Sequence, residues 1–214
     1  MDKKEHIIEA AIDLFAQKGF EGTSIRDLAA KADVNVAMVN YYFGSKDKLF
    51  EALVEMKAGS ARGILEELLK DKSLTSIEKI DRIIDSYIER LFLNRKFHRV
   101  LHQELIMGQR EALQESITNI LLPNSIAIKS IIEEGIERGQ FKQVDVTLTM
   151  VSLVGTINQV LLSKKYCLKL LEKKGEGYTP YEDPEFHERV SVHLKSMMRA
   201  HLLPPQPSSS NIPA

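Results

Sequence analysis

The sequence lacks the features that would cross-link a chain or anchor it in a membrane. It has a single cysteine, Cys167, and no tryptophan. One cysteine cannot close an internal disulfide, so a secreted, disulfide-stabilised fold is disfavoured and a reducing, cytoplasmic location is expected. No run of about 18 apolar residues occurs, and a helix that spans a membrane is therefore excluded.

An excess of charge of one sign is also missing. The 214 residues carry 29 basic and 30 acidic side chains, which gives a formal net charge of -1. A protein that coats nucleic acid through bulk electrostatics needs a large positive excess. Any binding to DNA must therefore be confined to a local surface.

Glycine and proline are sparse, with 11 and 7 residues. Between them, apolar residues recur at the three- and four-residue spacing of amphipathic helices, and no segment alternates as a half-buried strand does. The sequence therefore predicts an all-α fold. Short helices are expected before about residue 57. The longer predicted helices cover 74–93, 96–107, 111–138 with a kink at Pro123, 145–173 with Asp145 as its cap, and 183–203.

Residues 22–49 are the most informative stretch. Thr23 or Ser24 can cap one short helix and Asn35 can cap a second one, which is the pattern of a helix-turn-helix. Ser45 can cap the helix that follows. The predicted core of the motif consists of Ile25, Leu28, Ala29, Val34, Val39 and Phe43. With Val39 and Phe43 buried, the second helix turns an outward face to solvent that fits a major groove about 12 Å wide.

At these positions the sequence resembles the TetR family of bacterial transcriptional regulators. The resemblance covers about the first 55 residues. The matching residues are Phe15, Gly19, Thr23, the Ile-Arg-Asp-Leu-Ala run at 25–29, Ala32, Val34, Tyr42, Phe43, Ser45, Lys46 and Leu49. The resemblance implies a homodimer that binds a palindromic operator in double-stranded DNA. It also implies that the operator is released when a small molecule enters the larger C-terminal domain.

The resemblance assigns roles to individual residues. Thr23, Ser24 and Arg26 are expected to contact phosphates, and so is Lys46, which begins the next helix. The expected recognition-helix residues are Asn35, Val36, Ala37, Met38, Asn40, Tyr41 and Tyr42. Asn40 replaces the tyrosine that is usual in the family, and Met38 replaces a small hydroxyl residue. Asn40 can bond an adenine edge, so the base preferences of relatives do not transfer to this chain.

Three parts are predicted along the chain: a helix-turn-helix DNA-binding domain at 1–57, a helical effector-binding and dimerisation domain at 58–203, and a flexible tail at 204–214. The first part contains eight basic and ten acidic residues, a net charge of -2. This balance is the opposite of the basic surface expected for a DNA-binding domain. Acidic side chains such as Glu9, Asp13 and Glu51 are therefore expected to face away from the DNA.

In the C-terminal domain the resemblance implies an effector pocket. Small-molecule sites combine apolar bulk with a few polar groups. The candidate lining residues are Tyr87, Phe92, Phe97, Leu101, His102, Leu105, Ile106, Ile117, Met150, Val154 and Asn158. The alternative for each apolar member is plain core packing. For Tyr87, His102 and Asn158 it is a hydrogen bond within the core. The expected effector is small and largely apolar.

Two other chemistries are open to this domain. His98 and His102 lie four residues apart near Glu104, a spacing that a metal ion can use, but no clear third ligand follows. We therefore expect neither a metal nor a cofactor. Cys167 lies among the lysines of residues 164–169, which can lower the pKa of a thiol and make it a redox sensor. The alternative is a structural thiol.

A dimer surface is predicted on the last two long helices. Residues 148–156 are apolar around most of the helix circumference, which is more than one core face requires. Within them, Ser152 and Gly155 permit close approach of a second helix. The later helix offers Phe186, Val190, His193, Leu194, Met197 and Met198. Two such helices from each subunit would form a four-helix bundle.

The function expected from these features is that of a repressor that binds its operator as a homodimer and is released by an effector. One alternative is a helical DNA-binding dimer without a ligand switch. Another is an all-α enzyme or a partner-binding protein. An enzyme is disfavoured because the sequence shows no phosphate-binding loop, no paired zinc motif and no nucleophile with its base.

Overall fold

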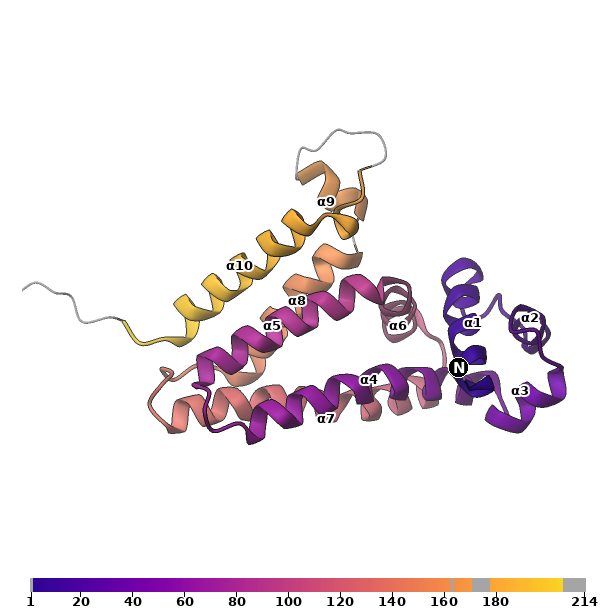
Figure 1. The fold of residues 1–214 in the computed structure, drawn as a ribbon, viewed down its shortest axis with the longest axis horizontal. Coiled ribbons are helices and arrows are strands. Elements are labelled where there is room, and N and C mark those ends of the chain that lie inside the picture. The colour runs from indigo at the N-terminus through magenta and orange to yellow at the C-terminus, as the bar shows by residue number, and fades with distance from the viewer. Residues whose placement is uncertain (1, 163, 171–177, 206–214) are drawn as a thin grey trace, which may run out of the picture.

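The computed structural model describes residues 2–162, 164–170 and 178–205. These ranges contain helices and no strand, so the predicted all-α fold is confirmed. An N-terminal lobe holds α1 (Lys3–Lys18), α2 (Ile25–Lys31) and α3 (Val36–Phe43), and it lies at one end of the molecule (Figure 1). Most of the expected tail, residues 206–214, lies outside the described residues.

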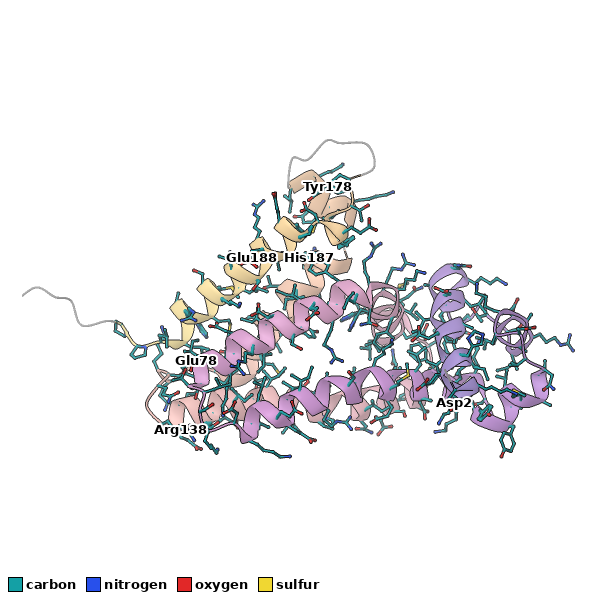
Figure 2. The ribbon with its side chains drawn as sticks, viewed as in Figure 1. Asp2, Glu78, Arg138, Tyr178, His187 and Glu188 are labelled. Carbon is teal, nitrogen blue, oxygen red and sulfur yellow. The ribbon has the colours of Figure 1, made fainter. Side chains whose placement is uncertain are left out.

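The larger part of the molecule is built from long helices. They are α4 (Lys46–Lys70), α5 (Ser76–Leu93), α6 (Arg95–Met107), α7 (Glu111–Glu137), α8 (Val146–Leu162), α9 (Lys164–Leu170) and α10 (Pro184–Leu202), with a 3₁₀ turn at Pro180–Glu182. The helices α4 and α7 lie side by side along the length of the molecule, and α5 packs between this pair and α10 (Figure 1). Glu78 and Arg138 lie at the end away from the N-terminal lobe (Figure 2).

The helix ends follow local sequence signals. Ser24 caps α2 in a capping box with Asp27. Asn35 Oδ1 accepts a hydrogen bond of 2.7 Å from the Met38 amide at the start of α3, and Ser45 caps α4 in the same way. Asp145 Oδ1 accepts from the Leu148 amide at 2.8 Å at the start of α8. Because each side chain satisfies an amide that has no partner in its helix, these four caps fix where the helices begin.

The region predicted as one helix over 145–173 differs from the expectation. Its described residues form two helices, α8 and α9, with residue 163 outside the description. The helix α7 runs through Pro123 as expected, and the kink at this residue stays a prediction. The turn after α7 contains Gly139 with φ of +68°, a conformation that glycine adopts without the strain of a Cβ atom.

Two apolar cores hold the fold together. The first joins α1, α2 and α3 to the beginning of α4, and it also includes Phe97, Val100 and Leu101 from α6 and Leu113 and Ile117 from α7. The second core joins the rest of α4 to α5, α7, α8 and α10. The N-terminal lobe therefore shares its core with the C-terminal part, and α4 contributes to both cores.

Candidate nucleic-acid interface and internal cavity

The helix-turn-helix has the outward face that the sequence predicts. Val39 and Phe43 of α3 are buried in the first core, which leaves the opposite side of the helix free. Tyr41 is 84% exposed, and the ring of Tyr42 packs edge-on to it with ring centroids 5.4 Å apart. The exposed residues of this face are Asn35, Val36, Ala37, Asn40 and Tyr41, while Met38 and Tyr42 are half-buried beside them.

The residues expected to contact phosphate differ in their surroundings. Ser24 and Arg26 are exposed. Thr23, by contrast, is only 1% exposed, and its Oγ1 donates a hydrogen bond of 2.8 Å to the Gly19 carbonyl. The structure therefore corrects the expectation for the Thr23 side chain, because a hydroxyl buried in the turn between α1 and α2 cannot reach a phosphate.

Lys46 is half-buried and bonds within the protein. Its Nζ donates to the Phe20 carbonyl at 2.8 Å and to the Thr23 carbonyl at 3.0 Å. It also lies 4.4 Å from the centroid of the Phe20 ring. An ammonium group has three donors; two of them make these bonds, and Glu21 Oε2 lies 3.9 Å from the same nitrogen. A phosphate would therefore have to compete with Glu21 for Lys46. Through these contacts Lys46 holds the start of α4 against the turn before α2.

Ion pairs explain how an acidic lobe can present a surface to DNA. Many of its carboxylates are paired, some of them with basic residues of the C-terminal part. The pairs are Glu9–Lys57, Asp13–Lys96, Glu21–Arg110, Glu21–Lys46, Asp27–Lys18, Asp47–Arg110, Glu51–Lys48 and Glu55–Arg62. Arg26 and Lys31 are exposed and form no ion pair within the described ranges. The negative charge is thus largely compensated, while two cations on α2 stay available.

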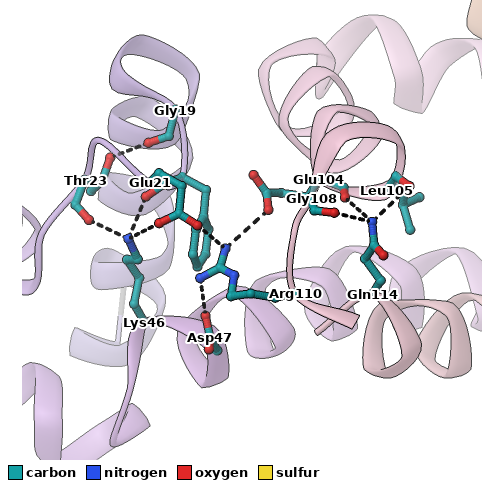
Figure 3. A network of polar contacts seen from close by, with 11 residues as sticks. Gly19, Glu21, Thr23, Lys46, Asp47, Glu104, Leu105, Gly108, Arg110 and Gln114 are labelled. Atoms are coloured by element: carbon teal, nitrogen blue, oxygen red, sulfur yellow. Dashed lines mark hydrogen bonds and ion pairs between the residues drawn. The ribbon is translucent and has the colours of Figure 1, made fainter. Parts of the chain in front are cut away.

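Arg110, in the segment between α6 and α7, connects the N-terminal lobe to the rest of the molecule (Figure 3). Its guanidinium lies 2.8 Å from Asp47, 3.2 Å from Glu21 and 3.4 Å from Glu104. It also stacks over the ring of Phe20 at 4.0 Å from the centroid. The two cations at this junction, Lys46 and Arg110, therefore both contact the same phenyl ring. We call the group formed by Glu21, Asp47, Glu104 and Arg110 the Arg110 cluster.

Glu104 is the buried member of the Arg110 cluster. It is 8% exposed, and burial raises the pKa of its carboxyl, against the opposing effect of the Arg110 charge. Gln114 closes this side of the cluster, since its Nε2 donates to the carbonyls of Glu104, Leu105 and Gly108 (Figure 3). The segment between α6 and α7 is thereby held against the N-terminal lobe.

A cavity of about 300 Å³ lies between α4, α5, α6, α7 and α8. This volume is at the lower end of small-molecule sites. The apolar lining residues are Ala58, Ala61, Phe97, Leu101, Leu105, Leu121, Ile128 and Val154, and the polar ones are Lys57, Tyr87, Arg90, Asn94, His98, His102, Asn124, Ser125 and Asn158. The cavity therefore has an apolar body with polar groups grouped around it.

Some polar groups of the cavity are buried without a full set of partners. Asn124 Oδ1 is buried and makes no hydrogen bond among the described residues. Burial lowers the pKa of His102, and a hydrogen bond with the side chain of Asn158 opposes this effect. Burial raises the pKa of the Tyr87 hydroxyl to about 12. Burial, and then the nearby charges of His102, Arg90 and Lys57, lower the pKa of His98 to about 3. Unsatisfied buried polar groups cost free energy, so a ligand that bonds to them would gain affinity.

The cavity contains most of the predicted pocket residues. Tyr87, Phe97, Leu101, His102, Leu105, Val154 and Asn158 line it. The other predictions are corrected. Ile106 is 75% exposed, Ile117 is buried in the first core, and Met150 packs against the second. Phe92 stacks on His187 with centroids 3.8 Å apart, outside the cavity. Sequence reasoning missed Lys57, Arg90, Asn94 and Asn124.

The metal site considered for His98 and His102 and the redox role considered for Cys167 can be compared with the surroundings of these residues. Within the described ranges no three His, Cys, Asp or Glu side chains group as metal ligands would. His98 and His102 face the cavity, whereas Glu104 belongs to the Arg110 cluster. Cys167 is buried, and burial raises the pKa of its thiol. This direction is opposite to the one that a redox sensor beside lysines needs, and it favours the alternative, a structural thiol.

The surface predicted for dimerisation is partly corrected. On α8, exposed residues recur at helical spacing and are apolar or small: Leu148, Val151, Ser152 and Gly155. On α10, the candidates Phe186, Val190, Leu194 and Met198 are buried in the second core of the same chain. The candidate His193 is exposed, and Val192 beside it is the large apolar residue of this helix that is exposed, at 55%. The exposed apolar face therefore lies mainly on α8.

Comparisons with known proteins agree with this architecture. Residues 7–53 match the family model of bacterial regulatory proteins of the tetR family, and residues 73–162 match a tetracyclin repressor-like C-terminal domain. The HTH-type transcriptional repressor NicS of Pseudomonas putida is 30% identical over 68% of both chains. The fatty acid metabolism regulator protein of Bacillus subtilis is 29% identical over 79% of this chain and 89% of its own.

A solved structure shows the same fold over nearly the whole length. The transcriptional regulator FadR from Bacillus subtilis, in complex with stearoyl-CoA, superposes with a TM-score of 0.71 at 24% identity. The superposition covers 90% of this chain and 97% of that one. Among the described residues no helix is long and apolar enough to cross a membrane. From its helix-turn-helix, its helical C-terminal part and these matches, the chain belongs to the TetR family of bacterial transcriptional regulators.

Proposed function

We propose that this regulator is a repressor that binds a palindromic operator as a homodimer and leaves it when a small, largely apolar effector fills the cavity. The observation that carries the DNA-binding part is the exposed face of α3, with Asn40 and Tyr41 held outward by the burial of Val39 and Phe43. Two such helices must lie about 34 Å apart to enter successive major grooves. No catalytic role is proposed.

The test of this function is a footprint of the purified protein on DNA upstream of its own gene, at two salt concentrations. We expect a protected palindrome whose affinity falls steeply as salt rises, because phosphate contacts release counterions. An absence of protection at low salt on this DNA and on a genomic fragment library would contradict the proposal.

The proposed contacts predict two kinds of loss of affinity for operator DNA. Asn40→Ala should weaken binding by about 1–3 kcal/mol at one base position, because its amide can read a base edge. Arg26→Ala should weaken binding to all operator sequences alike. It should also reduce the slope of log affinity against log salt concentration by about one, because its cation contacts a phosphate. Binding of an operator variant series at several salt concentrations measures both effects. A uniform loss for Asn40→Ala would show that Asn40 does not read bases.

The dimer is proposed from the apolar face of α8. Val151 is 51% exposed on that face, and a charge placed there would be buried without a partner in a dimer. Val151→Glu should therefore give a monomer by sedimentation equilibrium at micromolar concentration. Ile126→Glu is a matched control, since Ile126 is 52% exposed on α7. A dimer that survives Val151→Glu would place the interface elsewhere.

The proposal that a small-molecule effector binds this protein rests on the cavity. Its apolar body and the unpartnered Asn124 oxygen favour a molecule with a hydrocarbon portion and a polar end. The similarity to a fatty acid metabolism regulator and to a structure that holds stearoyl-CoA favours an acyl chain as the hydrocarbon portion. A coupling of roughly 1–3 kcal/mol between the cavity and the DNA surface would change operator affinity several-fold to a hundred-fold.

A further inference from the structure

The charge of the cavity is distributed unevenly. Lys57 of α4 and Arg90 of α5 line it, and no aspartate or glutamate is among the described residues of its wall. Both cations lie close enough to His98 to lower its pKa, together with burial and His102. Lys57 is paired with Glu9, whereas Arg90 has no acidic partner among the described residues. This part of the wall therefore keeps a positive charge, which a negatively charged ligand would compensate.

Arg90 has no carboxylate partner within the described ranges. Its Nη1 donates to Ser60 Oγ at 3.2 Å, and its Nη2 donates to the Lys57 carbonyl at 2.9 Å. Both acceptors are uncharged, and burial lowers the pKa of the guanidinium. A half-buried guanidinium has five donors and matches a carboxylate in shape, so Arg90 has charge and donors left for an anion.

Lys57 connects the cavity to the N-terminal lobe. Its Nζ lies 3.2 Å from Glu9 Oε1 of α1, and the same side chain lines the cavity. Because Glu9 is about half exposed, its ion pair with Lys57 is weak and open to competition. A second anion on the cavity side would share the Lys57 charge and weaken the hold of α4 on α1.

We propose that the cavity binds an anionic amphiphile, a free carboxylate on a hydrocarbon chain, with the carboxylate held by Arg90 and Lys57. This inference rests on the proposed function and adds the chemical class of its effector. The chain lies against Phe97, Leu101 and Val154, and the carboxylate competes with Glu9 for Lys57. A cavity of about 300 Å³ has the liquid volume of roughly ten water molecules, which suits a short or medium chain.

The test compares three probes that share an eight-carbon chain: octanoate, 1-octanol and octanoyl-CoA. Each is titrated calorimetrically into the full-length protein. We expect octanoate to bind at least about tenfold more tightly than 1-octanol, because a hydrogen bond between charged groups exceeds a neutral one. Octanoyl-CoA, whose thioester has no free carboxylate at the chain end, should bind more weakly than octanoate.

Variants test whether Arg90 and Lys57 cause the tighter binding of octanoate. Arg90→Gln should remove most of the difference between octanoate and 1-octanol, because it removes the charge and keeps an amide donor, and the thermal unfolding of the variant shows whether it is folded. Arg90→Lys should keep part of the preference. Arg82→Gln is the control, because Arg82 is exposed on the same helix and does not line the cavity. Glu9→Gln should tighten octanoate binding several-fold, since it removes the competing anion.

The outcomes separate this inference from the proposed function. Equal affinities for octanoate and 1-octanol, a preference that survives Arg90→Gln, or tighter binding of octanoyl-CoA would overturn the anion site and leave the effector cavity standing. Unchanged octanoate affinity in Glu9→Gln would overturn the competition for Lys57. No binding of any probe at millimolar concentration would overturn both the anion site and the acyl-chain effector, while the DNA footprint tests the regulator by itself.

Discussion

Glu134→Ala should lower the free energy of unfolding by about 3–5 kcal/mol, because it leaves the charge of Lys79 buried without a partner. Lys79 is 0% exposed, and its Nζ lies 3.1 Å from Glu134 Oε2. Glu134 also contacts Lys72 and Arg138, at 3.4 and 2.6 Å. Arg138 marks this cluster at the end of the molecule away from the N-terminal lobe (Figure 2).

Denaturant unfolding at a fixed protein concentration measures this loss, since the stability of the proposed dimer would depend on concentration. Glu133→Ala is the control, because Glu133 is the exposed neighbour on the same helix. Adding Lys79→Met to the Glu134→Ala chain should recover much of the stability, as a buried apolar side chain needs no counter-charge. A loss below about 1 kcal/mol for Glu134→Ala would mean that Lys79 is solvated.

The same pair predicts how stability depends on pH. Burial by itself would raise the pKa of Glu134, but the hydrogen bond and charge of Lys79, with Lys72 and Arg138, lower it below its ordinary value of 4.5. A carboxyl with a lowered pKa in the folded chain stabilises the fold above the unfolded pKa. We therefore expect this contribution to be complete above about pH 5 and to be lost as the pH falls through the folded pKa.

Arg110→Ala should lower the free energy of unfolding by about 2–3 kcal/mol and loosen the N-terminal lobe. The substitution removes the cation that Asp47, Glu21 and Glu104 share. Most of the loss should come from Glu104, because it is buried, whereas the partners that face water contribute less. Denaturant unfolding gives the stability, and hydrogen exchange of the α2 and α3 amides gives the loosening.

Two variants decide whether the Arg110 cluster is responsible. Glu104→Gln in the Arg110→Ala chain should restore part of the stability, because it removes the uncompensated carboxylate. Arg99→Ala is the matched control, since Arg99 also joins the two parts of the molecule but bonds only the Ala16 carbonyl, from an exposed position. Equal losses in Arg99→Ala and Arg110→Ala would show that the charges of the cluster add nothing.

Local signals made the helix-turn-helix predictable. Asn35 and Ser45 cap helices through bonds that span three residues, and the burial of Val39 and Phe43 follows from their four-residue spacing. Thr23 shows where this reasoning fails. A hydroxyl at the start of a helix has the same local pattern whether it faces solvent or donates back to the preceding turn, and packing against the first core decides between the two.

The charged and polar groups of the cavity could not be predicted for a different reason. Lys57, Arg90 and Asn124 come from α4, α5 and α7, and each lies in a sequence that also suits an ordinary solvated helix face. Only the packing of three helices brings them to one wall. Ile106 is the opposite case, because its apolar side chain at the end of α6 points to solvent. Its neighbours in sequence give no sign of this.

The length of α4 has a mechanical consequence. This one helix of 25 residues lines the cavity at Lys57 and begins at Lys46 beside the DNA-binding face. The two residues are eleven positions apart, which corresponds to roughly 17 Å along the helix axis. A tilt of about 5° at the cavity would displace the start of α4 by ~1.5 Å, and in the proposed dimer two subunits moving oppositely would change their separation by ~3 Å. That is about the rise of one base pair. A rotation too small to disturb the cores can therefore change the separation of the two recognition helices so that they no longer match successive major grooves.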